Sequence, residues 1–166
     1  MKGLERIEKD LYSVRDYLGK DDEIKKLLYY PTRNALQREN VSANLINEYI
    51  FLSPVFDTTR EPFDKNTFIS ITLANTEWND EDGTHMGAFR INVFSEVDLW
   101  ELDEDRVRPL AILSKMIEIL DQKKLKSSHK LFYISSDLTT LDKNIAGYTA
   151  LFGIVDGGGD SDEEFY

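Results

Sequence analysis

The sequence predicts one α+β domain in which a mostly antiparallel mixed sheet is flanked by helices. Two observations support this fold class. Segments with apolar residues at every third or fourth position are interspersed with segments in which apolar and polar residues alternate. The 166 residues, 41% hydrophobic and 31% charged, also suffice for one domain with its own core. We expect this domain to span residues 1–156 and a glycine-hinged acidic C-terminal tail to span residues 157–166.

Two amphipathic helices are expected at the start of the chain. Residues 3–19 place apolar side chains on one stripe, at Leu4, Ile7, Leu11, Val14 and Leu18. Gly19 is a suitable stop, and Asp21 or Asp22 can cap a second, short helix that ends before Pro31. The stripe predicts that the first helix packs on the domain's own sheet or, failing that, on a neighbouring subunit.

The stretch from Ala88 to Leu125 predicts the scaffold of the domain. Its first part alternates as a half-buried strand, with Phe89, Ile91 and Val93 on one face. Its last part, 106–125, predicts a helix whose buried stripe comprises Leu110, Leu113, Met116, Ile117 and Leu120. We expect this helix to cross one face of the sheet.

An acidic connection, Glu96 to Asp105, joins that strand to that helix and contains Trp100. Two interpretations stay open. Its acids can cap the following helix while Trp100 closes the edge of the core. Alternatively, Leu99, Trp100 and Glu101 form a subunit contact in which an apolar anchor is surrounded by carboxylates.

Four other segments predict strands: 48–55 (broken by Pro54), 67–76, 130–135 and 146–155. The three strands that precede the helix at 106–125, at 48–55, 67–76 and 86–95, can pair as an antiparallel meander. Asp82-Gly83 is a turn signal, so residues 77–85 are expected to form a hairpin loop, and residues 136–144 another loop. The last strand is almost continuously apolar, which predicts a central place in the sheet.

Charge and composition exclude several classes of function. The formal net charge of −11 argues against nucleic-acid binding, which needs a clustered basic surface. The absence of cysteine excludes disulfides and thiolate catalysis. No apolar run reaches the length of a membrane span, and the first residues lack a signal-peptide core, so we expect a soluble protein with no membrane partner.

Catalytic, metal and cofactor signatures are missing from the sequence. His85 and His129 stand apart, and neither accompanies a nucleophile motif. The acidic loop 77–85 does not fit the calcium-binding pattern, because Trp78 and Phe89 would occupy ligand positions. Gly157 to Gly159 precede no helix that could bind a phosphate. We therefore expect no enzyme activity, no cofactor and no resident metal.

Four segments together resemble the small neck proteins of tailed bacteriophages, most closely the tail terminator (head–tail joining) class. They are Ile24 to Pro31, Phe89 to Phe94 followed by Asp98-Leu99-Trp100, Arg106 to Pro109, and Ala146 to Tyr148. The resemblance covers most of residues 20–155 and leaves out the first helix and the acidic tail.

The resemblance implies a structural virion protein with a tail-terminator-like fold. Such proteins form a homo-oligomeric ring, expected to be a hexamer, that ends the tail tube and joins it to the head-closure or connector protein. DNA passes through the lumen without specific binding, and the ring is assembled in the host cytoplasm and resides in the virion.

The residues proposed for subunit contact are Leu99, Trp100, Glu101, Trp78, Asp80, Phe165 and Tyr166. The last two lie in the acidic tail, which we expect a neighbouring subunit to hold. Two alternatives remain: another neck component, such as a head-closure or connector subunit, and an acidic inhibitor that mimics DNA.

Overall fold

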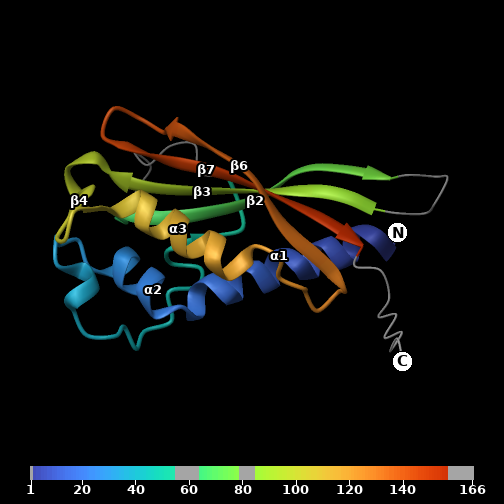
Figure 1. The fold of residues 1–166 in the computed structure, drawn as a ribbon, viewed down its shortest axis with the longest axis horizontal. Helices are drawn as coiled ribbons and strands as arrows, with labels where there is room; N and C mark the ends of the chain where they lie inside the picture. The colour runs from blue at the N-terminus through green and yellow to red at the C-terminus, as the bar shows by residue number, and fades with distance from the viewer. Residues whose placement is uncertain (1, 55–63, 79–84, 157–166) are drawn as a thin grey trace, which may run out of the picture.

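A computed structural model describes residues 2–54, 64–78 and 85–156 of the chain, and it confirms the α+β class (Figure 1). Its helices are α1 (Lys2–Lys20), α2 (Asp22–Tyr29) and α3 (Arg108–Leu120), with short 3₁₀ helices η1 (Ala35–Gln37) and η2 (Val97–Leu99). Its strands are β1 (Ile50–Phe51), β2 (Thr67–Trp78), β3 (His85–Glu96), β4 (Glu101–Leu102), β5 (Arg106–Val107), β6 (His129–Thr140) and β7 (Ile145–Asp156). No helix in the described ranges is both long and apolar enough to cross a membrane.

Five strands form the main sheet in the order β1-β2-β3-β7-β6. The β2–β3, β3–β7 and β7–β6 pairs are antiparallel, which confirms the predicted hairpin of β2 and β3 and the central position of β7. The expected antiparallel meander of β1, β2 and β3 is wrong, because β1 runs parallel to β2. Residues 52–66 connect these two strands, and a connection of that length can return the chain to the same direction.

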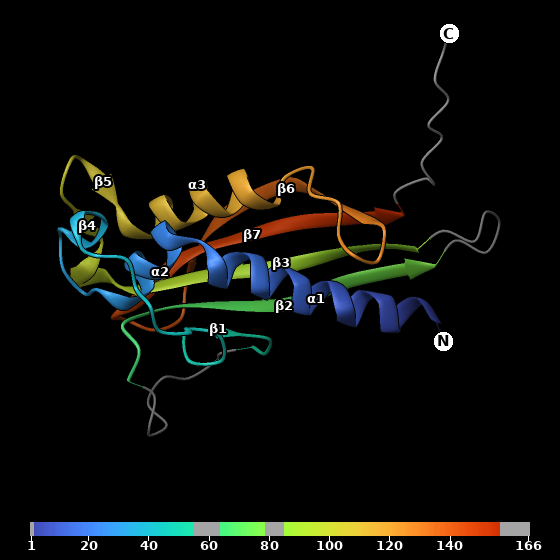
Figure 2. The same cartoon turned by 90° about the horizontal axis from the view of Figure 1, so that it is seen from below.

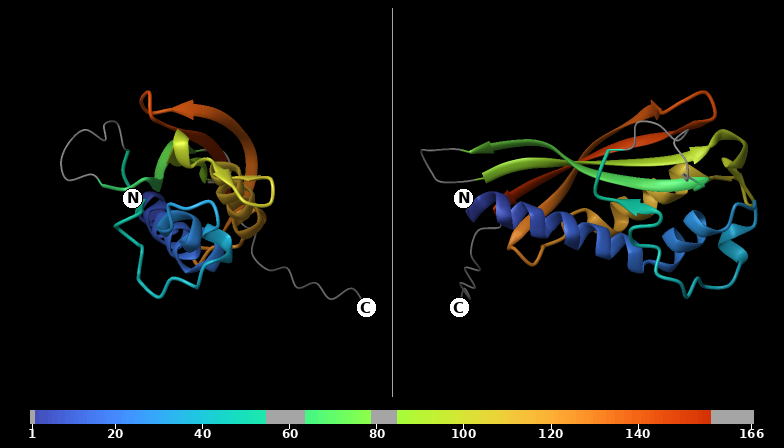
Figure 3. Two further views of the ribbon diagram at one scale, coloured as in Figure 1. Left: turned by 90° about the vertical axis from the view of Figure 1, so that its left-hand side faces the viewer. Right: turned by 180° about the vertical axis from the view of Figure 1, so that it is seen from behind.

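The helices cover one face of this sheet, with α1 beside α3 and running roughly along the strands (Figures 2 and 3). Helix α2 is capped as predicted, since the Asp21 side chain accepts a hydrogen bond of 2.9 Å from the backbone N–H of Ile24. The main core lies between the two layers and includes Ile7, Val14, Leu18, Phe89, Ile91, Met116, Leu120 and Phe152. A smaller cluster of Phe68, Phe94 and Ile145 packs near one end of the sheet.

Several expected boundaries differ from the structure. Strand β6 continues through residues 136–140, which were expected in a loop, because β7 continues to pair with them. Strand β1 has only two of the residues expected from 48 to 55. Two residues expected on buried stripes, Leu4 and Leu110, are 39% and 42% exposed. In α3 the buried face is rotated, so that Ala111 and Ile112 lie inside in place of Leu110.

Gly147 marks the closest approach of β7 to β3. A Cβ atom at this position would lie 1.7 Å from the carbonyl oxygen of Val93 on the paired strand. The obstacle is backbone and cannot rotate away, so only glycine fits without moving one of the two strands.

Replacing Gly147 with alanine should therefore destabilise the domain by at least ~1–3 kcal/mol, the usual range for overpacking. Urea unfolding followed by circular dichroism measures the change. Gly87→Ala is the matched control, because its Cβ would lie 3.0 Å from its nearest neighbours and calls for a smaller shift. Equal losses in the two variants would contradict the role assigned to Gly147.

Candidate functional site

The acidic connection folds into a small hairpin of β4 and β5. Glu104 and Asp105 make its turn with positive φ values of 63° and 58°. The connection does not cap the following helix, because the N-cap of α3 is Val107, no side chain caps it, and its first turn holds no acid. The helix-capping interpretation is therefore wrong. The predicted helix start at residue 106 is also wrong, because residues 106 and 107 pair with the other hairpin strand.

Trp100 is half-buried and packs inside its own subunit. Its indole Nε1 donates a hydrogen bond of 3.3 Å to the carbonyl oxygen of Ser95, and its ring centroid lies 6.2 Å from that of Tyr148. Leu99 beside it is also half-buried, whereas Glu101 is exposed and lies 3.5 Å from Arg33. Trp100 thus closes the edge of the core, and the outward-facing member of this trio is Glu101.

The structure brings Leu99, Trp100 and Glu101 together at one end of the sheet, but it does not test whether they contact another subunit. Trp78 ends β2, and its side chain is outside the described part. Asp80, Phe165 and Tyr166 fall outside the described residues. The subunit-contact role of all seven residues stays a prediction.

Arg108, at the start of α3, is the largest fully buried side chain in the described ranges, with 1% exposure. Its guanidinium donates to four backbone carbonyl oxygens: Leu27 at 2.6 Å, Thr32 at 2.8 Å, and Tyr30 and Leu99 at 2.9 Å. Leu27 lies in the last turn of α2, whose carbonyls have no partner within the helix. The guanidinium therefore caps α2, where a positive charge is also favoured by the helix dipole, and ties it to η2 and to the turn after Tyr29.

Burial lowers the pKa of Arg108 to about 10, because the surroundings penalise the charged form. At neutral pH the group is still protonated and keeps all five N–H donors. Arg108 cannot be singled out from the sequence, because an arginine before Pro109 is typical of a solvated helix start. No pattern in the sequence announces that three other segments converge on it.

Replacing Arg108 with alanine should lower the free energy of unfolding by ~3–5 kcal/mol, since several buried carbonyls lose their donor at ~1–3 kcal/mol each. The loss of unfolding free energy in Arg108→Lys should be smaller than in Arg108→Ala but still measurable, because an ammonium cannot reach four acceptors arranged around a planar fork. Urea titration gives both values. Arg90→Ala is the control, because that arginine is exposed on β3 and its loss should change stability by no more than ~0.5 kcal/mol. A cost for Arg108→Ala as small as that of the control would refute the capping role.

A second buried polar cluster joins α1 to the sheet. Asp10 is 0% exposed and His129 is 2% exposed, and Asp10 Oδ2 pairs with His129 Nδ1. The other ring nitrogen, Nε2, lies 3.1 Å from Asp156 Oδ1. Arg6 completes the cluster, with a nitrogen 3.2 Å from the same Asp156 oxygen and 2.7 Å from the carbonyl oxygen of Ser127.

This arrangement favours a structural role for His129. Both ring nitrogens face carboxylate oxygens, from Asp10 on one side and Asp156 on the other. With both nitrogens engaged, the ring has none left to activate a nucleophile. His129 is thus not isolated in the fold as it is in the sequence, and Asp10 is not on the surface. A usable signal existed for Asp10, because it lies on the α1 stripe between Ile7 and Val14.

Replacing Asp10 alone with leucine should cost ~1–3 kcal/mol, because it leaves the buried ring nitrogen of His129 without its hydrogen-bond partner. Replacing Asp10 and His129 together with leucine should cost clearly less than the sum of the two single variants, because both partners of the buried polar pair are then removed. Chemical denaturation of the four proteins of this cycle measures the coupling. Additive losses would show that the pair does not act as a unit.

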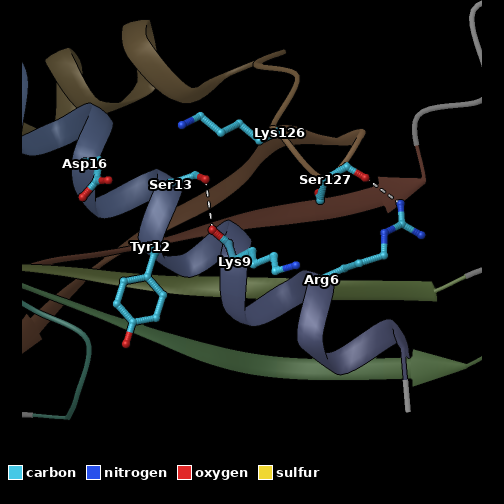
Figure 4. A pocket seen from close by; sticks show the side chains of 7 residues that line it. All are labelled: Arg6, Lys9, Tyr12, Ser13, Asp16, Lys126 and Ser127. Atoms are coloured by element: carbon cyan, nitrogen blue, oxygen red, sulfur yellow. Dashed lines mark hydrogen bonds between the residues drawn. The ribbon is translucent and has the colours of Figure 1, made fainter.

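A basic pocket of about 460 Å³ opens beside this cluster. Arg6, Lys9, Tyr12, Ser13, Asp16, Lys126 and Ser127 line it. Figure 4 shows Lys9 extending from α1 and Lys126 from the loop that follows α3, on the other side of the opening. Three cations around one pocket are unexpected in a chain of net charge −11, and the sequence analysis did not identify them.

Within residues 2–54, 64–78 and 85–156, no group of three or more His, Asp or Glu residues is placed to hold a metal ion.

Comparison with known proteins places most of the chain in one family. The family model YomW matches residues 21–154, which include α2, α3 and the main sheet except for the last two residues of β7. The family name is that of a prophage gene, which associates the family with phages. No curated protein matches the chain.

Proposed function

The chain belongs to the YomW family, and from this phage-associated membership we propose that it is a structural subunit of the neck of a tailed phage. Several copies form a ring that ends the tail tube and joins it to the head connector. The resemblance of Ile24 to Pro31 and of the other three segments to tail terminators supports the neck assignment. The observation that carries the proposal of self-assembly is the outer edge of β6.

Strand β6 is the outermost of the main sheet and is 12 residues long. Residues 121–125 cover its first part, where the N–H of Leu131 donates to the carbonyl oxygen of Lys123 at 2.9 Å. Beyond this point the strand exposes Ile134 and Leu138, which are 50% and 64% exposed. Residues 131–140 contain neither lysine nor proline, which often block pairing at an edge. The N–H of Tyr133 is occupied by Asp121, and the register shifts between Tyr133 and Ser135, so the open stretch is residues 135–140, with Asp137 as its single charge.

The opposite edge of the sheet is also largely open. The two residues of β1 pair only with Ile69 and Ser70, so most of the 12-residue β2 has no strand on its outer side within the described part of the chain. An edge at each side of one sheet suits a head-to-tail contact, in which β6 of one subunit meets β2 of the next. Contacts of this heterologous kind form a ring when the rotation between neighbours closes and a filament when it does not, and we propose the ring.

The charge of the chain agrees with a channel for DNA. Each subunit carries a net charge of −11, so a hexamer would carry six times that value. Carboxylates around a lumen would repel the phosphates of passing DNA and keep it from adhering. Specific DNA binding is not part of the proposal.

The ring can be tested by electron microscopy and light scattering of the purified protein. We expect six-fold rings with a central hole, and we expect Leu138→Lys to shift the population toward monomers by at least tenfold in the assembly constant, because a charge at the edge opposes strand pairing. Leu110→Lys is the matched control, because Leu110 is exposed on α3 and away from both sheet edges. The monomers of both variants should unfold at the same thermal midpoint as the monomer of the parent protein.

A protein that stays monomeric at high concentration and binds neither tail-tube nor connector proteins would refute this function. The alternatives are separated by partner binding. A head-closure or connector subunit would bind the head portal but not the tail tube, and a DNA mimic would inhibit a DNA-binding enzyme without forming rings.

A further inference from the structure

We infer that the basic pocket between α1 and the loop after α3 binds the acidic tail of the same chain, through residues 160–164. The contact lies within one subunit and replaces the expectation that a neighbouring subunit holds the tail, while the ring proposed above does not depend on it. Three features carry it: cations without partners in the pocket, the place where the described chain ends, and the composition of the segment that follows.

Lys9 and Lys126 supply the available charge. Both are exposed, and neither ammonium has a carboxylate partner among residues 2–54, 64–78 and 85–156. The third cation, Arg6, is already paired with Asp156 and with the carbonyl oxygen of Ser127. Asp16 is the single acid in the pocket lining, so the site keeps an excess of positive charge.

The end of β7 brings the tail to this pocket. Asp156 is the last described residue, and its carboxylate lies 3.2 Å from Arg6 in the pocket wall. Residues 157–159 are glycines, so Asp160 can lie at most about 14 Å from Asp156 along an extended chain. Lys9 is one helical turn from Arg6, about 4.5 Å along α1, and is therefore within reach.

The composition of the tail matches the pocket. Residues 160–164 read Asp-Ser-Asp-Glu-Glu, and Phe165 and Tyr166 follow. Carboxylates can pair with Lys9 and Lys126, while Ser13 and Ser127 offer hydroxyl donors in the lining.

Energetics favours the tail of the same chain over any separate molecule. Each exposed ion pair contributes too little to hold a separate acidic peptide at micromolar concentration. A segment tethered by three glycines has an effective concentration in the millimolar range, and contacts this weak can then fill the pocket for much of the time.

Electron paramagnetic resonance on the full chain tests the contact whether the protein is monomeric or assembled into rings. The chain has no cysteine, so Ser161→Cys provides one site for a nitroxide label. We expect an immobilised spectral component that falls at least threefold in Lys9→Glu/Lys126→Glu and in 0.5 M salt. The control variant Lys20→Glu/Lys143→Glu makes the same charge change at exposed positions outside the pocket and should keep that component. A freely mobile label in the parent, or an equal loss in both double variants, would overturn the inference.

Zero-length carbodiimide cross-linking then identifies the chain that supplies the tail. The unlabelled parent protein is mixed in equal amounts with ¹⁵N-labelled protein, and peptides joining Lys9 or Lys126 to residues 160–164 are analysed by mass. Links within a chain join two light or two heavy peptides, whereas tails exchanged between chains would make about half of the links mixed. Mixed links, or no links from either lysine, would overturn the inference. Neither result depends on whether rings are seen by microscopy, so the two proposals fail separately.

Discussion

One buried cation fixes α3, α2 and η2 relative to one another. The guanidinium of Arg108 is the common donor for α2, for the turn after it and for η2, three segments separated by up to 81 positions from Arg108 in sequence. Backbone carbonyls in an apolar interior need a donor, and these carbonyls share one. The beginning of α3, the end of α2 and the edge that Trp100 closes are therefore fixed relative to one another by the same planar group.

The elements that sequence could predict are those with strong periodicity. Strands β2, β3 and β7 and helices α1 and α2 follow from apolar spacing, the Asp21 cap and Pro31, since these are local signals. The parallel β1 and the extension of β6 through residues 136–140 could not be predicted, because both depend on a partner strand distant in the chain. Leu110 shows the same limit for packing. Its spacing fits the stripe, but the neighbours of α3 decide which face is buried.

The polar clusters were harder to predict than the fold. Asp10 gave one signal, a carboxylate on an apolar stripe, whereas His129 gave none because its partners lie in α1 and at the end of β7. The basic pocket is likewise assembled from α1 and a loop more than a hundred residues later. Charge statistics of a whole chain conceal such a site, because a net charge of −11 averages over a local excess of cations.

The pairing of Arg6 with Asp156 sets how the domain responds to mechanical load. It joins the beginning of α1 to the end of β7, so a force applied between these two ends acts first on this ion pair and on His129 behind it. Strand β7 resists further, because it is paired along its length with both β3 and β6. Behind the ion pair, the buried stripe of Ile7, Val14 and Leu18 holds α1 on the sheet, so helix and sheet would bear the load together.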